Sequence, residues 1–211
     1  EPQTQNQPPD TSRIEPAPVP TDSAALELWS RHTNLPDARA VRTVDKGQNG
    51  GALHVTLDRL EGWETLEPPS QAWPFAPDHT LTCFEAKGSA NTRQLAVEWI
   101  EQDGSRWIAT VDLAPEWRRY ALPPESFRPW QPPAGRGGAG DRVNLGRLAR
   151  FTLGLALTHT SVEPGKQEYW FANLGTAPNP FGAASAPATL PVPRIESFAP
   201  DSVVYPVGTA V

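Results

Sequence analysis

The segment WIEQDGSRWIATVDL, Trp99 to Leu113, constrains the fold more than any other. It contains two runs of alternating apolar and polar residues, joined by Gln102-Asp103-Gly104-Ser105. Alternation with a period of two indicates strands, and a short turn with Asp and Gly between two such runs indicates an antiparallel hairpin. The segment therefore predicts a hairpin with one tryptophan on each strand.

The same signal recurs along the middle of the chain, where no long helical period competes with it. The predicted strands are 40–44, 52–57, 80–87, 94–101, 106–113, 118–122, 151–158 and 168–174. Only Ser23 to Trp29 and a turn around Leu145 to Leu148 suggest helix. About eight strands at this spacing predict an all-β chain, folded as an antiparallel β-sandwich or jelly roll.

The prolines mark where the packed body begins and ends. Of 25 prolines, six lie in the first 20 residues and seven lie after Gly175. Such stretches make poor core material because proline fixes φ and lacks a donor. We expect a Pro-rich arm at 1–21, a β-sandwich at 22–176, a linker at 177–193, and at 194–211 the start of an immunoglobulin-like module or an edge strand.

Charge and composition exclude several partners. The net charge is −6 and the 18 Lys and Arg are scattered, so a nucleic-acid partner is not expected. No apolar run approaches the length of a membrane span. The single cysteine, Cys83, is expected to be a buried, inert thiol in a strand.

The first residues predict export. The opening EPQTQNQPPDTSRIEPAPVP is rich in Pro, Thr and Gln, and the chain contains no methionine. This composition is typical of a linker that follows a removed signal peptide or joins exported modules. We expect a secreted, periplasmic or cell-surface protein, in which the arm packs against another element.

No catalytic motif is complete. The four histidines lie in four different segments, without metal-ligand spacing, and no G-x-S-x-G is present. Five acidic residues are either solvated surface groups or the carboxylate pair of a glycosidase: Glu61, Glu64, Glu67, Asp103 and Asp141. The run GRGGAG matches a phosphate-binding fingerprint, but no strand precedes it and no helix follows, so a flexible loop is expected.

Strand registers assign the hairpin tryptophans to the core. Residues two apart share a face, and Trp99 and Trp107 belong to the more apolar sets. The opposite face of the hairpin mixes polar and aliphatic residues suited to a ligand: Glu98, Ile100, Arg106, Ile108 and Thr110.

Two later strands continue this reasoning. In the first, Phe151, Leu153, Leu155 and Leu157 form a core row, so that the small residues Thr152, Gly154, Ala156 and Thr158 face outward. In EYWFANL, Tyr169 and Phe171 point inward, which turns Trp170 outward. On a face with Glu98, Arg106 and Thr110, Trp170 could stack on a sugar ring. Alternatively, Trp170 covers a sheet edge or packs under the arm.

Three further tryptophans offer a rival site. Trp63, Trp73 and Trp130 lie in turn-rich surroundings, in EGWETLEPPS, QAWPFAPD and FRPWQPPA. They either seal the end of the sandwich or, with Arg128 and Glu64 nearby, form an aromatic rim around a ligand.

Five segments together resemble a known family. They are GGALHVTLDRLEGWETLEPP, LTCFEAKG, LAVEWIEQDGSRWIATVDLAPEWRRYALPPESF, LARFTLGLAL and EYWFANL. In this order they resemble the galactose-binding-like jelly rolls, and in particular the family 11 carbohydrate-binding modules of bacterial glycoside hydrolases. The resemblance spans roughly Leu26 to Thr176.

The resemblance implies a ligand on the outward sheet face or at the loop tip, and a structural role for Trp117. It also implies a structural calcium, with ligands that include an Asp of the closing strand and an earlier Glu27. Here Ala172 takes the place of that Asp, which removes a carboxylate. No other metal or cofactor is expected.

Three hypotheses follow. The first is a non-catalytic carbohydrate-binding module of an exported multidomain protein, which holds a polysaccharide or oligosaccharide near a catalytic domain. The second is a structural β-sandwich that packs on adjacent domains of the same polypeptide and has no ligand. The third, an enzyme, needs carboxylates or histidines clustered in one pocket.

Overall fold

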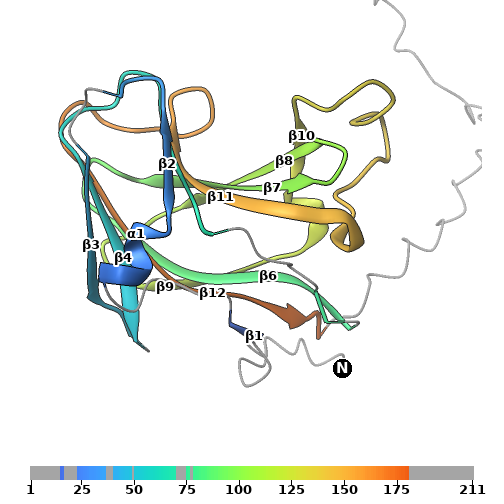
Figure 1. Ribbon diagram of the computed structural model, residues 1–211, viewed down its shortest axis with the longest axis horizontal. Helices are drawn as coiled ribbons and strands as arrows, with labels where there is room; N and C mark the ends of the chain where they lie inside the picture. The colour runs from blue at the N-terminus through green and yellow to red at the C-terminus, as the bar shows by residue number, and fades with distance from the viewer. Residues whose placement is uncertain are drawn as a thin grey trace, which may run out of the picture. The chain divides into compact units, whose positions relative to one another are not determined.

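Two antiparallel β-sheets face each other across one hydrophobic core. The computed structural model describes residues 15–16, 23–36, 40–48, 50–69, 75–76 and 78–180. In Figure 1, β8 (Arg106–Asp112), β7 (Gln94–Glu101) and β11 (Leu148–Ala156) run above β6 (His79–Gly88) and β12 (Gln167–Pro178). The predicted all-β sandwich is thus confirmed.

Sheet A contains the closing strand in its middle. Its strand order is β3-β4-β12-β6-β9, and β1 pairs with β12 beside this path. The strands not yet located are β1 (Glu15–Pro16), β3 (Ala40–Lys46), β4 (Gly51–Leu57) and β9 (Arg118–Leu122). Residues Glu15 and Pro16, within the predicted arm, pair with Thr176 and Gly175.

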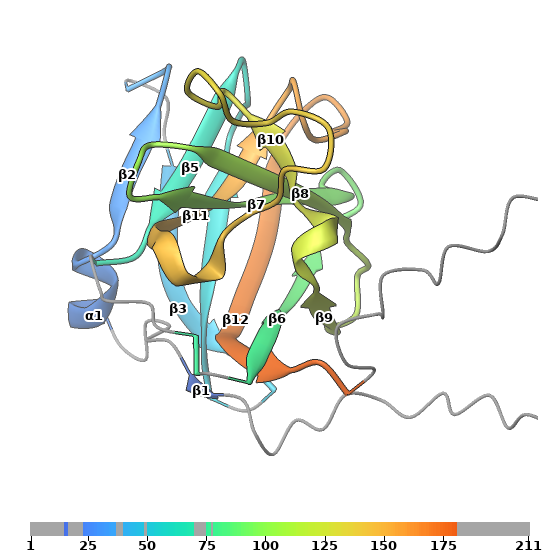
Figure 2. The ribbon, with the colours of Figure 1, turned by 90° about the vertical axis from the view of Figure 1, so that its right-hand side faces the viewer.

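Sheet B carries the predicted hairpin. Its strand order is β10-β8-β7-β11-β5-β2, with β10 (Arg128–Trp130), β5 (Trp63–Glu67) and β2 (Ser30–Thr33). The chain passes repeatedly between the sheets, because β4, β6, β9 and β12 belong to sheet A while β5, β7 and β11 belong to sheet B. This alternation is the jelly-roll arrangement. The helix α1 (Ser23–Glu27) lies at the edge of the sandwich, on the side of β2 and β3 (Figure 2).

The hairpin tryptophans lie in the core, as predicted. Trp99 and Trp107 pair in register across β7 and β8, and both are fully buried. The Trp99 Nε1–H donates to Thr82 Oγ1 of sheet A at 2.9 Å, which satisfies the indole and ties the sheets together. Tyr169 and Phe171 also point inward, as expected.

The eight predicted strands correspond to β3, β4, β6, β7, β8, β9, β11 and β12. The strands β1, β2, β5 and β10 were not predicted, and of these β2, β5 and β10 lie at or next to an edge of sheet B. The predicted core row ends at Leu155 and does not include Leu157, which follows the last residue of β11 and is 52% exposed.

Cys83 is buried as expected, and burial raises the pKa of its thiol to about 11. No helix among the described residues is long and apolar enough to cross a membrane.

The glycine-rich loop after β10 is held in place by one arginine. Arg136 donates to both carboxylate oxygens of Glu101, at 2.9 and 3.1 Å, and also to Asp103 and Asp141. Hydrogen bonds to Glu101 and then Asp141 raise the pKa of Arg136 above its usual value. We predicted a flexible loop from the glycines; the structure adds three carboxylate partners of Arg136, which the sequence does not show.

Candidate functional site

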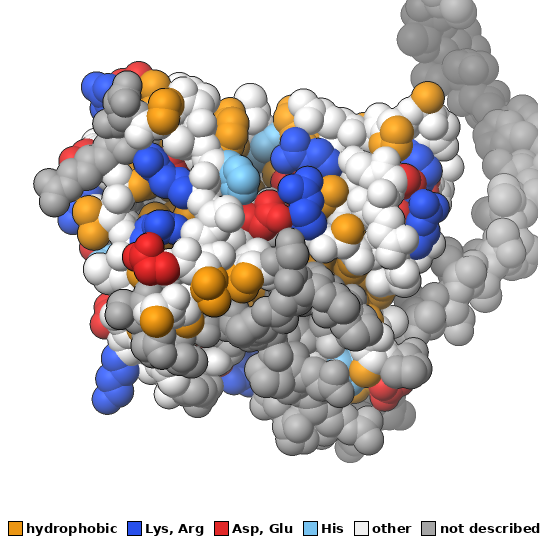
Figure 3. All heavy atoms as spheres, in the orientation of Figure 1, with side chains coloured by type: hydrophobic (Ala, Val, Ile, Leu, Met, Phe, Trp, Pro, Cys, Tyr) orange, Lys and Arg blue, Asp and Glu red, His pale blue; other side chains and the backbone are white. Residues whose placement is uncertain are grey.

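A cleft of about 290 Å³ opens on the outer face of sheet B. Its lining comes from β5, β7, β8, β10 and β11 and from the turn after β11. Figure 3 shows acidic, basic and histidine side chains close together on the visible side of the molecule. The outer face of sheet B, which carries the cleft, is the face that the sequence predicted to hold polar, aliphatic and small side chains.

Small residues keep the floor of the cleft open. Ala96, Thr152, Gly154 and Ala156 line it, and all are outward-facing residues of β7 and β11. A Cβ added at Gly154 would lie 2.1 Å from the backbone oxygen of Glu64 on β5, so only glycine permits this close approach of the strands.

A partly buried ion pair, with Glu98 buried and Arg106 more exposed, crosses the floor. Arg106 donates to both carboxylate oxygens of Glu98, from Nε at 2.6 Å and from Nη2 at 2.9 Å. Thr152 Oγ1 donates to Glu98 Oε2 at 3.0 Å, and Arg106 Nη1 donates to Gln131 Oε1 at 3.2 Å. Hydrogen bonding to Glu98 raises the pKa of Arg106. The pair presents charged, oriented hydrogen-bonding groups to the cleft, and it confirms that Glu98 and Arg106 lie side by side.

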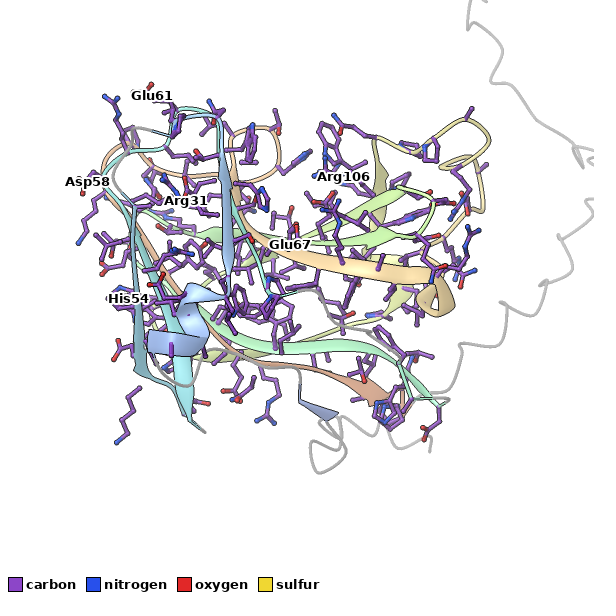
Figure 4. The ribbon with its side chains drawn as sticks, in the orientation of Figure 1. Arg31, His54, Asp58, Glu61, Glu67 and Arg106 are labelled. Carbon is purple, nitrogen blue, oxygen red and sulfur yellow. The ribbon has the colours of Figure 1, made fainter. Side chains whose placement is uncertain are left out.

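Figure 4 shows Arg106 on the sheet-B side of the sandwich, whereas His54 belongs to the other sheet. Thr110, the third predicted residue of this face, does not line the cleft. Its hydroxyl donates to the backbone oxygen of His159 at 3.1 Å and so anchors the turn after β11.

Two tryptophans form the walls of the cleft. Trp63 begins β5 and is 41% exposed, and Trp130 ends β10. The strands β8, β7 and β11 separate these two in the sheet. We predicted that both lie in loops, but they lie on short strands. The structure brings Trp63 and Trp130 together with Glu98 and Arg106, and Trp73 lies outside the described residues.

Trp170 points outward, as predicted, but from sheet A. It therefore does not share a face with Glu98, which lies in the cleft on the outer face of sheet B. In register, Trp170 lies between His54 on β4 and Lys87 on β6. The imidazole of His54 stacks on its ring at 4.2 Å, and Lys87 Nζ lies 4.3 Å from the ring centroid. These two neighbours occupy the ring faces that a sugar would need.

Replacing Trp170 with alanine is expected to lower the free energy of unfolding by about 1–2 kcal/mol, because a stacked cross-strand pair and a cation–π contact are lost. The indole also donates to Asp45 Oδ2 at 2.9 Å, which lowers the pKa of that carboxyl. Urea denaturation measures the loss. Trp170→Phe, which retains an aromatic ring but no donor, should lose less; equal losses in both variants would contradict a role for the stack.

The other predicted carboxylates are engaged away from the cleft. Glu64 points inward and pairs with Arg31, Glu67 pairs with Arg150, and Glu61 pairs with Arg59. Asp103 and Asp141 both bind Arg136. Glu98 is thus the single carboxylate among the described residues that line the cleft.

The described residues do not fit the calcium site that the resemblance implied. Ala172 is buried in β12 and offers no side-chain oxygen, while Glu27 is exposed on α1. The neighbouring Glu85 is bound by Arg119 and Asn173. In the described part of the chain, no three His, Cys, Asp or Glu side chains come close enough to hold a metal ion.

The sequence matches no family model and no curated protein. The structure, in contrast, resembles several solved structures. A family 11 carbohydrate-binding module from Clostridium thermocellum, in complex with a β-1,3-1,4-mixed-linked tetrasaccharide, superimposes with a TM-score of 0.58 at 13% identity, over 79% of this chain and 95% of that one. An agarase, AgWH50C, superimposes with a TM-score of 0.55 at 10% identity, over 80% of this chain and 25% of that one.

A family 30 carbohydrate-binding module of a cellulosomal cellulase from Clostridium thermocellum gives a TM-score of 0.51 at 9% identity, over 72% of this chain and 92% of that one. At these identities the likeness concerns the fold, and fold alone does not assign function. The resemblance seen in the sequence is nevertheless confirmed at that level: this chain has the β-sandwich fold of the family 11 carbohydrate-binding modules.

Proposed function

We propose that this chain is a non-catalytic carbohydrate-binding module and that it binds a polysaccharide in the cleft of sheet B. The observation that carries the proposal is the composition of the cleft: two tryptophans, Trp63 and Trp130, beside a floor that holds a charged pair, Glu98 and Arg106. Indole faces pack against the C–H groups of a pyranose, and forked charged groups hydrogen-bond its hydroxyls.

The carboxylates favour binding over hydrolysis. Glycoside hydrolysis generally uses two carboxyl groups placed on either side of the scissile bond. The described lining offers Glu98, and both of its oxygens are held by Arg106. This carboxylate orients the guanidinium instead of acting as a free acid or base.

The structural neighbours suggest which glycans to test first. One neighbour was solved with a β-1,3-1,4-mixed-linked tetrasaccharide, and two are agarases in which the similar region is about a quarter of the chain. We infer an exported protein in which this module keeps a catalytic domain close to its polysaccharide, through the gain in effective concentration that tethering provides.

Affinity gel electrophoresis tests the proposal. Four gels contain, respectively, mixed-linkage β-glucan, hydroxyethylcellulose, xylan and agarose. The chain should be retarded in at least one of them, and it should release no reducing sugar from the glycan that retards it. Calorimetry with the matching oligosaccharide should give one site. If all four glycans leave the migration unchanged, the proposal is wrong and the structural sandwich of the second hypothesis replaces it.

A further inference from the structure

His159 packs against Trp130 and, like Trp130, lines the cleft. It lies in the turn after β11, and its imidazole meets the Trp130 indole at a centroid distance of 4.2 Å and an interplanar angle of 82°. Its backbone oxygen accepts the hydrogen bond from Thr110 on β8. The turn is therefore fastened to β8, so that the imidazole is held against the indole of β10.

The hydrogen bonds of His159 assign its tautomer. Arg128 Nη2 lies 3.1 Å from His159 Nδ1, and a guanidinium can only donate. Nδ1 is therefore the acceptor, and the proton of the neutral ring is on Nε2. Nε2 is buried and has no hydrogen-bond partner among the described residues. The perpendicular contact with Trp130 is the geometry in which an aromatic edge meets a π face.

A second proton on His159 would break this arrangement. It would go to Nδ1, where it would point at the Arg128 guanidinium on β10. The positive charge of Arg106 on β8 also disfavours a charged His159, whereas the negative charge of Glu98 on β7 favours it. Burial first, and then Arg128, hold the pKa of His159 below its ordinary value of 6.5. The folded protein therefore favours the neutral ring.

We propose that neutral His159 is a positioning residue that holds Trp130 in the cleft wall, and that the cleft loses affinity for its glycan when His159 takes up a proton. The second part rests on the proposed function. Because the pKa of His159 in the folded state lies below 6.5, the neutral imidazole prevails at pH 7. The contact with Trp130 is then lost as the pH falls through that pKa.

The first test needs no glycan. In NMR titrations, His159 should show the Nε2–H tautomer and a midpoint below 6.5, and the Trp130 Nε1–H signal should shift with the same midpoint. In His159→Phe, which retains an aromatic ring without a titrating group, the Trp130 signal should not change between pH 7 and 5. A His159 midpoint at or above 6.5, or a Trp130 signal independent of His159, would overturn the proposal even if glycan binding is intact.

The second test measures affinity for the glycan of the panel that binds best at pH 7. From pH 7 down to pH 5, the dissociation constant should rise about three- to tenfold in the wild type. A tenfold rise corresponds to a pKa of His159 that is about one unit lower in the glycan complex than in the free protein. It should stay constant in His159→Phe. His32→Phe is the matched control, because His32 lies on β2 and does not line the cleft, and it should retain the wild-type pH dependence. Equal pH dependence in His159→Phe and the wild type would refute the proposal, whereas failure to bind any glycan at pH 7 would refute the proposed function and with it this second part.

Discussion

Arg136→Leu is expected to lower the free energy of unfolding by about 3–5 kcal/mol. The carboxylate of Glu101 is fully buried, and Arg136 bonds both of its oxygens. Among the described residues, the backbone N–H of Asn144 is the donor that would remain for the Glu101 carboxylate without Arg136, at 2.9 Å. A buried charge without its counter-ion costs far more than a surface pair contributes. Guanidinium denaturation measures the change.

Arg142→Leu is the matched control, because Arg142 pairs with Glu125 where both side chains are exposed, and it should cost less than about 1 kcal/mol. The double variant Arg136→Leu, Glu101→Leu should be more stable than Arg136→Leu alone, since it also removes the stranded carboxylate. An Arg136→Leu variant as stable as the Arg142 control would show that the network contributes little.

The double variant Trp63→Ala, Trp130→Ala is expected to lose retardation in the glycan gel altogether. Each single variant should weaken binding by about 30-fold, the effect of about 2 kcal/mol that truncating a central aromatic contact typically has. Both side chains line the cleft, and Trp63 is substantially exposed, so the Trp63 change should leave the fold intact. Calorimetry with the bound oligosaccharide measures the two single effects.

Trp170→Ala discriminates between the two faces of the sandwich. It lies on sheet A, so it should destabilise the chain without changing its affinity for glycan. If binding is lost in Trp170→Ala and retained in the cleft variants, the ligand lies on sheet A and the cleft has another role.

The sequence predicted the long strands because their alternation is strong. It did not predict β2, β5 and β10, because SRHT lacks apolar residues, WETLE is flanked by turn residues, and RPW contains a proline. These short strands form at the margin of a sheet that the long strands have already built. Their pairing determines their structure, and local sequence does not show it: β5 pairs with β11, β10 with β8, and β2 with β5.

The candidate site was predicted in part for the same reason. Period-two alternation correctly turned Glu98, Arg106 and Trp170 outward, but it cannot say which of two sheets a strand joins. Trp170 and Glu98 therefore appeared to share a face, although they lie on opposite sheets. His159 was not proposed for the site, because a single histidine in a turn carries no pattern; only the folded chain brings it to Trp130.

The wall tryptophans of the cleft lie on the margins of a sheet whose middle holds most of its core. β7, β8 and β11 hold the long buried rows, while Trp63 and Trp130 are contributed by short strands toward the margins of sheet B. Of these short strands, β5 also adds Leu66 to the core, on the opposite face from Trp63. Replacement of the outward residues of these strands would change the chemistry of the walls and leave the buried rows in place. A scaffold arranged in this way can acquire a new sugar preference through a few local replacements, at little risk to its ability to fold.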